Sequence, residues 1–497
     1  IGPESFQQAA LFHTDELAKL YIEFEAGDAN TFKDIVSRHI YEPYVWQVRH
    51  FAQGSKHEAT FIFTPSGQKY GFLEVIPETT SGAALASHEA QKIAQTGASE
   101  QWGINFSDYK LVDASQEVML SKRVDHAFTY EKNNEHIGKA TYRLRLVVRG
   151  DKLSEILPFV KVPEEFIARY TELRSANQGI AMIAGGIFLL VYLLGGCGFG
   201  LAFLVRNRSA LWKPALVAAF VVSALNFLAN LNQMPLLWMH YPTALGMNQF
   251  LLKNLIIYIF GFLVSVAMLS VIFVTSEGLT RKGFKAHPQL WKVWKSCAAS
   301  SYEIVGRTAG GYLLVGFMLA FIVALYSFSI RYLGWWIPSD HLTNPNILAT
   351  YFPWLNAVAS SLHAGFMEEC GFRALPIAAA AILGNRFGKR SWWIAGAVVL
   401  QAFVFGAMHA TYPALPAYAR LIELIIPSFM FAVVYLRYGL LPVIITHAVF
   451  DLVLFSIPLF VTEAAGAWIN QIFVIMIGLV PAIIVLMAII RKGGMHK

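Results

Sequence analysis

The sequence predicts an α-helical polytopic membrane bundle of about nine spans, which follows an N-terminal extracytoplasmic α+β domain. Of its 497 residues, 56% are hydrophobic and only 14% are charged, whereas a soluble protein carries about 25% charged residues. The apolar excess is confined to residues 179–491, and residues 1–178 have the composition of a soluble domain. Basic residues also gather in alternate loops between the apolar segments. These three observations set the fold class and the order of the domains.

Long apolar segments carry the membrane prediction. A helix needs about 20 apolar residues to cross about 30 Å of hydrocarbon, and most of the segments have this length. The fifth is longer, so we expect it to be tilted, broken or preceded by an interfacial helix. The nine segments run approximately over residues 179–205, 213–233, 251–275, 308–330, 351–384, 391–409, 419–437, 440–461 and 467–490.

The charge of the loops predicts the orientation of the chain. The positive-inside rule places the basic loops in the cytoplasm, which makes residues 1–178 extracytoplasmic and the C-terminus cytoplasmic. The same loops account for the net charge of +7, so the charge does not indicate a nucleic-acid partner. Because the chain begins with Ile1, an upstream signal peptide or membrane helix is a further expectation. The basic loops are residues 206–213, 281–295, 386–390, Arg437 and 491–497.

The N-terminal domain shows the alternation of antiparallel strands. A weak internal echo suggests two related helix-plus-sheet units, and no catalytic constellation stands out, so we interpret the domain as a module that binds or regulates a partner protein. It contains no cysteine, which excludes a disulfide framework. Strands are expected near residues 44–52, 57–63, 69–76, 109–114, 126–130 and 139–148. Helices are expected near residues 7–24, 84–96 and 164–175.

Polar clusters inside the most apolar stretch give the active-site hypothesis. An Asp, Lys or Arg at the centre of a membrane helix costs roughly 2.5–3.5 kcal/mol on insertion scales, so several of them together indicate function. Glu369 and Arg373 are four residues apart and share a helix face, whereas Glu368 points about 100° away and is the freer carboxylate. The candidate catalytic residues are Glu368, Glu369, Arg373, His409, His447 and Asp451.

Each cluster also has a structural interpretation. A Glu–Arg pair can simply hold two helices together, and a histidine at the end of a span can be interfacial. The same residues can form a proton or ion relay in a membrane transporter, or the chain can be a catalytically silent scaffold that binds a partner through its N-terminal domain. The occurrence of all the clusters on three spans of one bundle favours the enzyme.

The three motifs resemble those of the CPBP intramembrane proteases, a family that includes the Rce-type CAAX prenyl endopeptidases and the bacteriocin-processing and abortive-infection proteins. The motifs are Glu-Glu-x-x-x-Arg, Phe-x-x-x-His and His-x-x-x-Asn/Asp, and the match covers roughly residues 350–455. Family members usually have Gly where this chain has Ala374, and commonly Asn where it has Asp451. Neither departure removes a proposed catalytic group.

The resemblance implies a division of the chain into three domains and a location in a membrane. Residues 1–178 would be the extracytoplasmic domain, residues 179–340 accessory transmembrane helices, and residues 341–497 the catalytic transmembrane core. A multi-pass protein of a bacterial inner membrane is implied, with a peptide or membrane-protein substrate in the lipid bilayer.

The resemblance also implies the chemistry, which is hydrolysis of a peptide bond. Glu368 would activate a water as general base with assistance from His409, and His447 would stabilise the oxyanion or hold the water. Asp451 would orient His447, and Glu369 with Arg373 would shape the site. The roles of Glu368 and Glu369 are exchangeable at this point.

A metal ion is the open alternative for that chemistry, because the family has been described both as metalloproteases and as glutamate proteases. In the first case Zn²⁺ would be bound by Glu368, His409 and His447. In the second no cofactor is required, and we favour this version.

Overall fold

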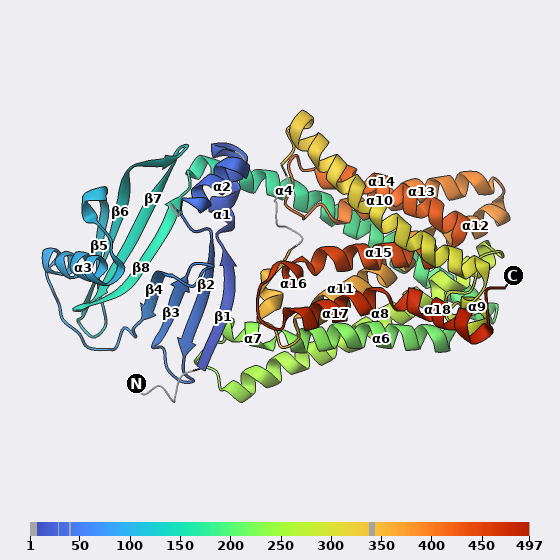
Figure 1. Ribbon diagram of the computed structural model, residues 1–497, viewed down its shortest axis with the longest axis horizontal. Helices are drawn as coiled ribbons and strands as arrows, with labels where there is room; N and C mark the ends of the chain where they lie inside the picture. The colour runs from blue at the N-terminus through green and yellow to red at the C-terminus, as the bar shows by residue number, and fades with distance from the viewer. Residues whose placement is uncertain (1–6, 28, 39–40, 337–342, 497) are drawn as a thin grey trace. The chain divides into compact units, whose positions relative to one another are not determined.

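The computed structural model describes residues 7–27, 29–38, 41–336 and 343–496, which fall into two compact units (Figure 1). The sheet unit comprises Ile1–Tyr170 and Met234–Asn254, and the helical unit comprises Thr171–Gln233 and Leu255–Lys497. Lys497, the last basic residue of the sequence, lies outside the described residues. The three-part division at residues 178 and 340 stays a prediction.

One antiparallel sheet of eight strands forms the described core of the sheet unit, in the order β1-β2-β3-β4-β8-β7-β6-β5. Two four-stranded meanders therefore meet edge to edge, where β4 pairs with β8 at Phe72↔Ile156 and Leu73↔Glu155 (Figure 1). The strands are β1 (Gln7–Thr14), β2 (Tyr44–Phe51), β3 (Glu58–Phe63), β4 (Lys69–Val75), β5 (Tyr109–Val118), β6 (Val124–Ile137), β7 (Ala140–Arg149) and β8 (Lys152–Lys161). The short helical elements before β2 are α1 (Glu16–Tyr21), η2 (Ile22–Ala26) and α2 (Ala29–Ser37).

Helix α3 (Ser87–Trp102) covers the second meander. Its alanines recur every fourth residue, at 90, 94 and 98, so they line one face and are fully buried. That small-residue face packs on alternate residues of the strands, including Phe128 and Leu146. The helix ends at Gly103, which adopts the left-handed conformation with φ 68° that a C-terminal glycine allows.

The prediction of an N-terminal antiparallel sheet domain is confirmed, with two errors inside it. Residues 7–14 are a strand and not the start of a helix, because β1 pairs with β2 along its whole length. Local hydrophobic spacing does not reveal such a pairing, and tertiary contacts override weak helical propensity. Strand β8 was not expected; it lies between β4 and β7 in the sheet.

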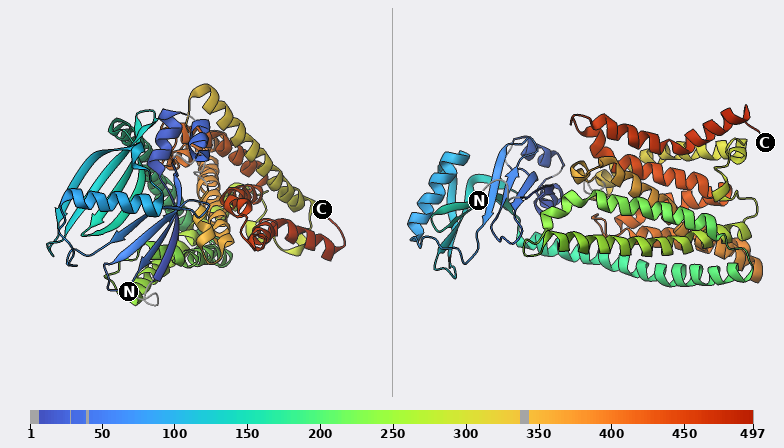
Figure 2. Two further views of the ribbon diagram at one scale, coloured as in Figure 1. Left: turned by 60° about the vertical axis from the view of Figure 1, so that its left-hand side comes forward. Right: turned by 90° about the horizontal axis from the view of Figure 1, so that it is seen from below.

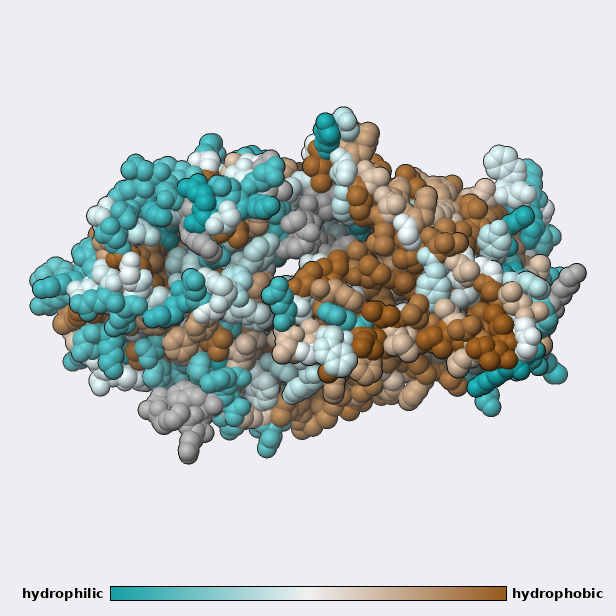
Figure 3. Space-filling view, viewed as in Figure 1, coloured by the Kyte–Doolittle hydropathy of each residue, from teal (hydrophilic) through white to brown (hydrophobic). Residues whose placement is uncertain are grey.

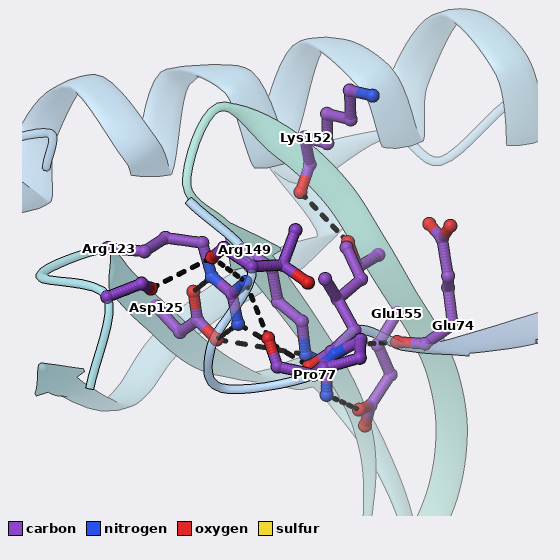
Figure 4. A network of polar contacts seen from close by, with 11 residues as sticks. Glu74, Pro77, Arg123, Asp125, Arg149, Lys152 and Glu155 are labelled. Atoms are coloured by element: carbon purple, nitrogen blue, oxygen red, sulfur yellow. Dashed lines mark hydrogen bonds and ion pairs between the residues drawn. The ribbon is translucent and has the colours of Figure 1, made fainter. Parts of the chain in front are cut away.

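A buried charge network ties the connection after β4 to strands β6 and β7 (Figure 4). Arg123 is 2% exposed and donates to both oxygens of Asp125, from Nε at 2.7 Å and from Nη2 at 3.0 Å. Its Nη1 also donates to the carbonyl oxygens of Pro77 at 3.1 Å and Thr80 at 2.8 Å. The Arg123 guanidinium therefore holds the connection after β4 in place, although this connection pairs with none of the described strands.

Arg149 extends this network across the join of the two meanders. It donates to the carbonyl oxygen of Glu74 at 2.5 Å, and its Nη2 lies 4.0 Å from Glu155 (Figure 4). Burial raises the pKa of Glu155 and lowers the pKa of Arg149, in both cases because the charged form loses water. Arg149 joins the network through Asp125, whose Oδ2 lies 3.9 Å from Nε of Arg149.

Replacing Arg123 by alanine should destabilise the sheet unit by about 3–5 kcal/mol, because buried Asp125 loses both of its close hydrogen bonds and keeps only the 3.9 Å contact with Arg149. Hydrogen–deuterium exchange on the full chain in detergent measures this as faster exchange at residues 76–80 and in β6. The control is Lys139→Ala, since Lys139 forms an exposed pair with Glu165 at 3.6 Å and exposed pairs contribute about 0–1 kcal/mol. Equal exchange in the two variants would contradict a stabilising role for the network.

The helical unit consists of helices that run side by side (Figures 1 and 2), and apolar residues gather on its surface (Figure 3). A first helical run joins α4 (Glu164–Ile187), η4 (Phe188–Phe199) and α5 (Gly200–Arg206), and is followed by α6 (Trp212–Asn232), α8 (Met247–Gly283), η6 (Leu290–Lys292), α9 (Ser296–Ala299), α10 (Tyr302–Leu333) and η7 (Pro345–Ala349). The short helices α7 (Met234–Leu237) and η5 (Trp238–His240), together with the first residues of α4 and α8, belong to the sheet unit. The remaining elements are α11 (Pro353–Glu368), η8 (Glu369–Ala374), α12 (Leu375–Phe387), α13 (Arg390–Met408), α14 (Ala419–Tyr438), α15 (Leu440–Phe455), α16 (Ile457–Val461), α17 (Ala467–Gly478) and α18 (Val480–Lys492).

The multi-pass membrane prediction is confirmed, but the count of nine spans is not. Among the described residues, six helices are long and apolar enough to cross a membrane, or seven if α17 and α18, bent by 60°, form one span. The fifth and eighth expected segments are not among these six. The fifth contains the charged residues of η8, and α15 has only 16 residues. The charged residues of the candidate site thus lower the hydropathy by which a membrane-spanning helix is recognised.

Candidate active site

Three elements of the helical unit bring five of the six candidate residues together. Helix α11 ends at Glu368, and the π-helical segment η8 begins with Glu369 and carries Arg373. Helix α15 carries His447 and Asp451 one turn apart. Contacts of 2.7–3.6 Å join these five side chains, and His447 lies at the centre of them.

The close approach of α11 and α15 depends on a glycine. A Cβ atom added to Gly365 would lie 2.8 Å from Cβ and 3.1 Å from Cα and N of Ala448. Contacts below 3.0 Å force the backbone to move, so only glycine permits this helix spacing. Gly365 lies three residues before Glu368 and Ala448 directly follows His447, so the contact sets the distance between the carboxylates and the imidazole.

Replacing Gly365 by valine should reduce activity by about 100-fold, because displacing reacting groups by about 1 Å has an effect of this size. The matched control is Gly310→Val on α10, since a Cβ added there meets nothing within 4 Å. Both variants are compared by cleavage rate and by thermal unfolding in detergent. A Gly365→Val protein with wild-type activity would contradict the proposed dependence on helix spacing.

Carboxylates face both nitrogens of the His447 ring. Nδ1 lies 2.7 Å from Oε1 of Glu369, a hydrogen-bond distance. Nε2 lies 3.6 Å from Oε2 of Glu368 and 3.5 Å from Oδ2 of Asp451. The Nδ1–H of His447 donates to Glu369, and this bond fixes the orientation of the ring. In a neutral imidazole that donates from Nδ1, Nε2 is left as an acceptor.

The Glu369–Arg373 pair expected from helical spacing is present, and both side chains are fully buried. Nε of Arg373 lies 3.4 Å from Oε2 of Glu369, and Nη2 donates to Oγ of Ser428 at 3.4 Å. The guanidinium carbon stands 3.8 Å from the centre of the Phe405 ring and 5.6 Å from that of Phe431. Ion pairing and cation–π contact together offset the burial of the charge.

Glu368 differs from Glu369 in exposure and in contacts. Its side chain is 21% exposed, against 0% for Glu369, and Asp451 beside it is 15% exposed. Oε2 of Glu368 has no hydrogen-bond partner among the described residues. The expectation that Glu368 is the freer carboxylate therefore agrees with the geometry, and Glu369 is committed to His447 and Arg373.

His409 joins the group through an aromatic ring. It follows the last residue of α13, and its Nδ1 lies 2.7 Å from the carbonyl oxygen of Phe405. The Phe405 ring is centred 4.6 Å from that of His409 and 6.4 Å from that of His447. Because a carbonyl only accepts, Nδ1 of His409 carries the proton and Nε2 is the free acceptor.

Sequence reasoning did not find every member of the site. The expected His447–Asp451 pair is present at 3.5 Å, but the shorter contact of His447 goes to Glu369. Ser428 and Gln401 support Arg373 from the side, since Gln401 donates to the carbonyl oxygen of Ser428 at 3.1 Å. A buried polar residue in an apolar span is a sequence signal that could have found both.

The candidate metal ligands do not fit a metal ion in this arrangement. Among the described residues, no group of three or more His, Cys, Asp or Glu side chains is placed to hold one. Glu368, His409 and His447 therefore do not form such a group, and Nδ1 of each histidine is already in contact with a protein oxygen.

Comparison with known families identifies this region. Residues 350–453 match the family described as type II CAAX prenyl endopeptidase Rce1-like, and this range contains all six candidate residues. The resemblance expected from the three motifs is thereby confirmed. No curated protein and no solved structure gave a match.

Proposed function

We propose, on the premise that residues 350–453 are an Rce1-like type II CAAX prenyl endopeptidase domain, that the chain is an intramembrane endopeptidase that needs no metal. The family indicates a protease with a peptide or membrane substrate in the bilayer. The observation that carries the finer proposal is the asymmetry of two adjacent glutamates. Glu369 is fully buried, with one oxygen 2.7 Å from Nδ1 of His447 and the other 3.4 Å from Nε of Arg373, whereas Glu368 is 21% exposed and its Oε2 lies 3.6 Å from Nε2 of His447 without a hydrogen bond.

Glu368 is the general base of the proposed reaction. Its Oε2 and Nε2 of His447 are 3.6 Å apart, a separation at which one water can contact both groups. The carboxylate takes a proton from this water, whose oxygen then attacks the carbonyl carbon of the scissile peptide bond. As the tetrahedral intermediate collapses and the C–N bond breaks, protonated Glu368 gives that proton to the leaving amine nitrogen. His409 assists by exchanging a proton through Nε2, since its Nδ1 is held by the Phe405 carbonyl.

Glu369 and Arg373 act on the reaction through His447. Glu369 holds the imidazole from Nδ1 at 2.7 Å, and Arg373 balances the charge of Glu369 inside the helices. His447 in turn presents Nε2 toward the oxyanion that forms from the attacked carbonyl, and stabilises it once that nitrogen carries a proton. Asp451, 3.5 Å from Nε2, supports the protonated ring.

Comparison of membrane proteomes tests the proposed activity. Cells that make the wild-type chain should accumulate new peptide termini that are missing with the Glu368→Gln/Glu369→Gln double variant at equal expression. Peptide termini that do not differ between the two strains would overturn the protease. Cleavage by the purified chain that stops with a chelator, and returns with added Zn²⁺, would overturn the metal-free mechanism alone.

The sheet unit is proposed to select a partner or substrate on the extracytoplasmic side. Its surface is hydrophilic in Figure 3, and the basic loops place residues 1–178 outside by the positive-inside rule. A cysteine introduced at exposed Lys122, with the exposed native Cys297 replaced by serine, should react with a membrane-impermeant thiol reagent in intact spheroplasts if this orientation holds. Labelling only after lysis would reverse the orientation.

A further inference from the structure

A second feature of the helical unit lies outside the catalytic group. A groove of about 880 Å³ runs between η4 with α5, the end of α8, and helices α12 and α13. Pockets of about 300–1,000 Å³ hold ligands of drug size, so this one accommodates a long chain. We refer to it as the α12–α13 groove. Its lining includes none of the six candidate catalytic residues.

Small residues create the hollow, and large apolar residues form its rim. Gly195, Gly196 and Gly396 line it, and a Cβ added to Gly396 would meet nothing within 4 Å. Phe199 is 79% exposed and Trp392 is 78% exposed. In a helix bundle that crosses a bilayer, such a rim faces lipid, so the groove opens to hydrocarbon chains.

Positive charge is confined to one end of the groove. Arg386 lies in the last turn of α12, and Lys389 immediately precedes α13. Both residues line the groove and are exposed, and within the described part of the chain neither forms an ion pair. Trp392 and Trp393 follow at the same end, the position that tryptophan prefers at the membrane–water interface.

We propose that the α12–α13 groove binds an anionic phospholipid, with one acyl chain in the hollow and the phosphate on Arg386 and Lys389. The apolar walls match the chain, and the two free cations match the charge of the phosphate. A zwitterionic lipid carries the same phosphate next to its own choline cation, which weakens its attraction to Arg386 and Lys389. An apolar peptide segment would fill the hollow but would not need them.

The site also borders the catalytic group. Tyr192 lines the groove, and its ring centre is 5.8 Å from that of Phe372, the residue before Arg373. A bound acyl chain would therefore pack against Tyr192, whose ring contacts Phe372 of η8. This contact is independent of which peptide the enzyme cleaves.

Native mass spectrometry of the delipidated full chain in detergent tests the proposal. The probes are phosphatidylglycerol and phosphatidylcholine with identical acyl chains, titrated separately. Wild type should bind phosphatidylglycerol roughly ten- to thirty-fold more tightly, the effect of two cations near an anionic lipid. Arg386→Gln/Lys389→Gln should abolish this preference, and Gly396→Trp should weaken binding of both lipids by at least about ten-fold by filling the hollow.

Two control variants are matched to these changes. Gly310→Trp places the same side chain at another helix position where an added Cβ meets nothing within 4 Å, and Arg491→Gln/Lys492→Gln removes two exposed cations from the end of α18. Both should bind like wild type. Equal affinity of wild type for the two lipids, or an unchanged preference in Arg386→Gln/Lys389→Gln, would overturn the proposal. If Gly396→Trp loses its unfolding transition, the charge variant decides, because its side chains are exposed.

Discussion

Replacing Glu368 by glutamine should lower the rate at which new termini appear by about 10³-fold, within the 10²–10⁴-fold range that a general base contributes. Glutamine keeps the shape of the side chain but cannot take a proton from water. The partly exposed position of Glu368 and its unpartnered oxygen predict that the fold tolerates the change. Quantitative terminal proteomics at matched expression, with thermal unfolding of the purified chain, measures both outcomes.

The control for this prediction is another glutamate inside the membrane. Glu277 of α8 is 2% exposed and lies outside the catalytic group, so Glu277→Gln should cleave at the wild-type rate. A Glu368→Gln protein that keeps its unfolding temperature and its activity would remove Glu368 from the mechanism. Equal losses of activity in both variants would show that any buried glutamate matters.

Replacing Glu369 by glutamine should reduce both activity and stability. Activity falls by about 10²-fold or more because His447 loses the carboxylate that fixes its ring at 2.7 Å. Stability falls by about 3–5 kcal/mol because fully buried Arg373 keeps its charge without its partner. The two glutamates are adjacent in sequence, yet only Glu369 should produce a large drop in unfolding temperature.

A second substitution separates these two effects. Glu369→Leu/Arg373→Met removes both charges, and replacement of a buried ion pair by apolar groups of similar size is often neutral or stabilising. The unfolding temperature should therefore recover, while cleavage stays low because His447 is still not fixed. Recovery of both properties would show that Glu369 acts only by balancing Arg373.

The sequence points to the candidate residues of the site more readily than to the contacts between them. Helical spacing was sufficient for Glu369 with Arg373, because residues four apart on one helix always share a face. The same helical spacing also paired His447 with Asp451. The shorter bond of His447 goes to Glu369, 78 residues earlier in the chain, and no local period encodes that contact. It depends on the close approach of α11 and α15 at Gly365, which is a property of packing.

The same distinction explains the errors in the fold. The strands of the second meander have a clear alternation, and β6 and β7 lie where the pattern placed strands. Residues 7–14 carry a mixed pattern, and their conformation is set by pairing with β2. The count of nine spans is not confirmed for a related reason: hydropathy alone cannot separate a full crossing from the short helix α15 or the charged segment η8.

The most direct test of a single catalytic unit is a double-mutant cycle between Glu368→Gln and His447→Ala, read as the rate of substrate cleavage. Residues that act on one water and one carbonyl lose activity non-additively. The double variant should therefore cleave within about threefold of the slower single variant. If the two losses multiply instead, Glu368 and His447 act independently, and the proposed shared water between them is wrong.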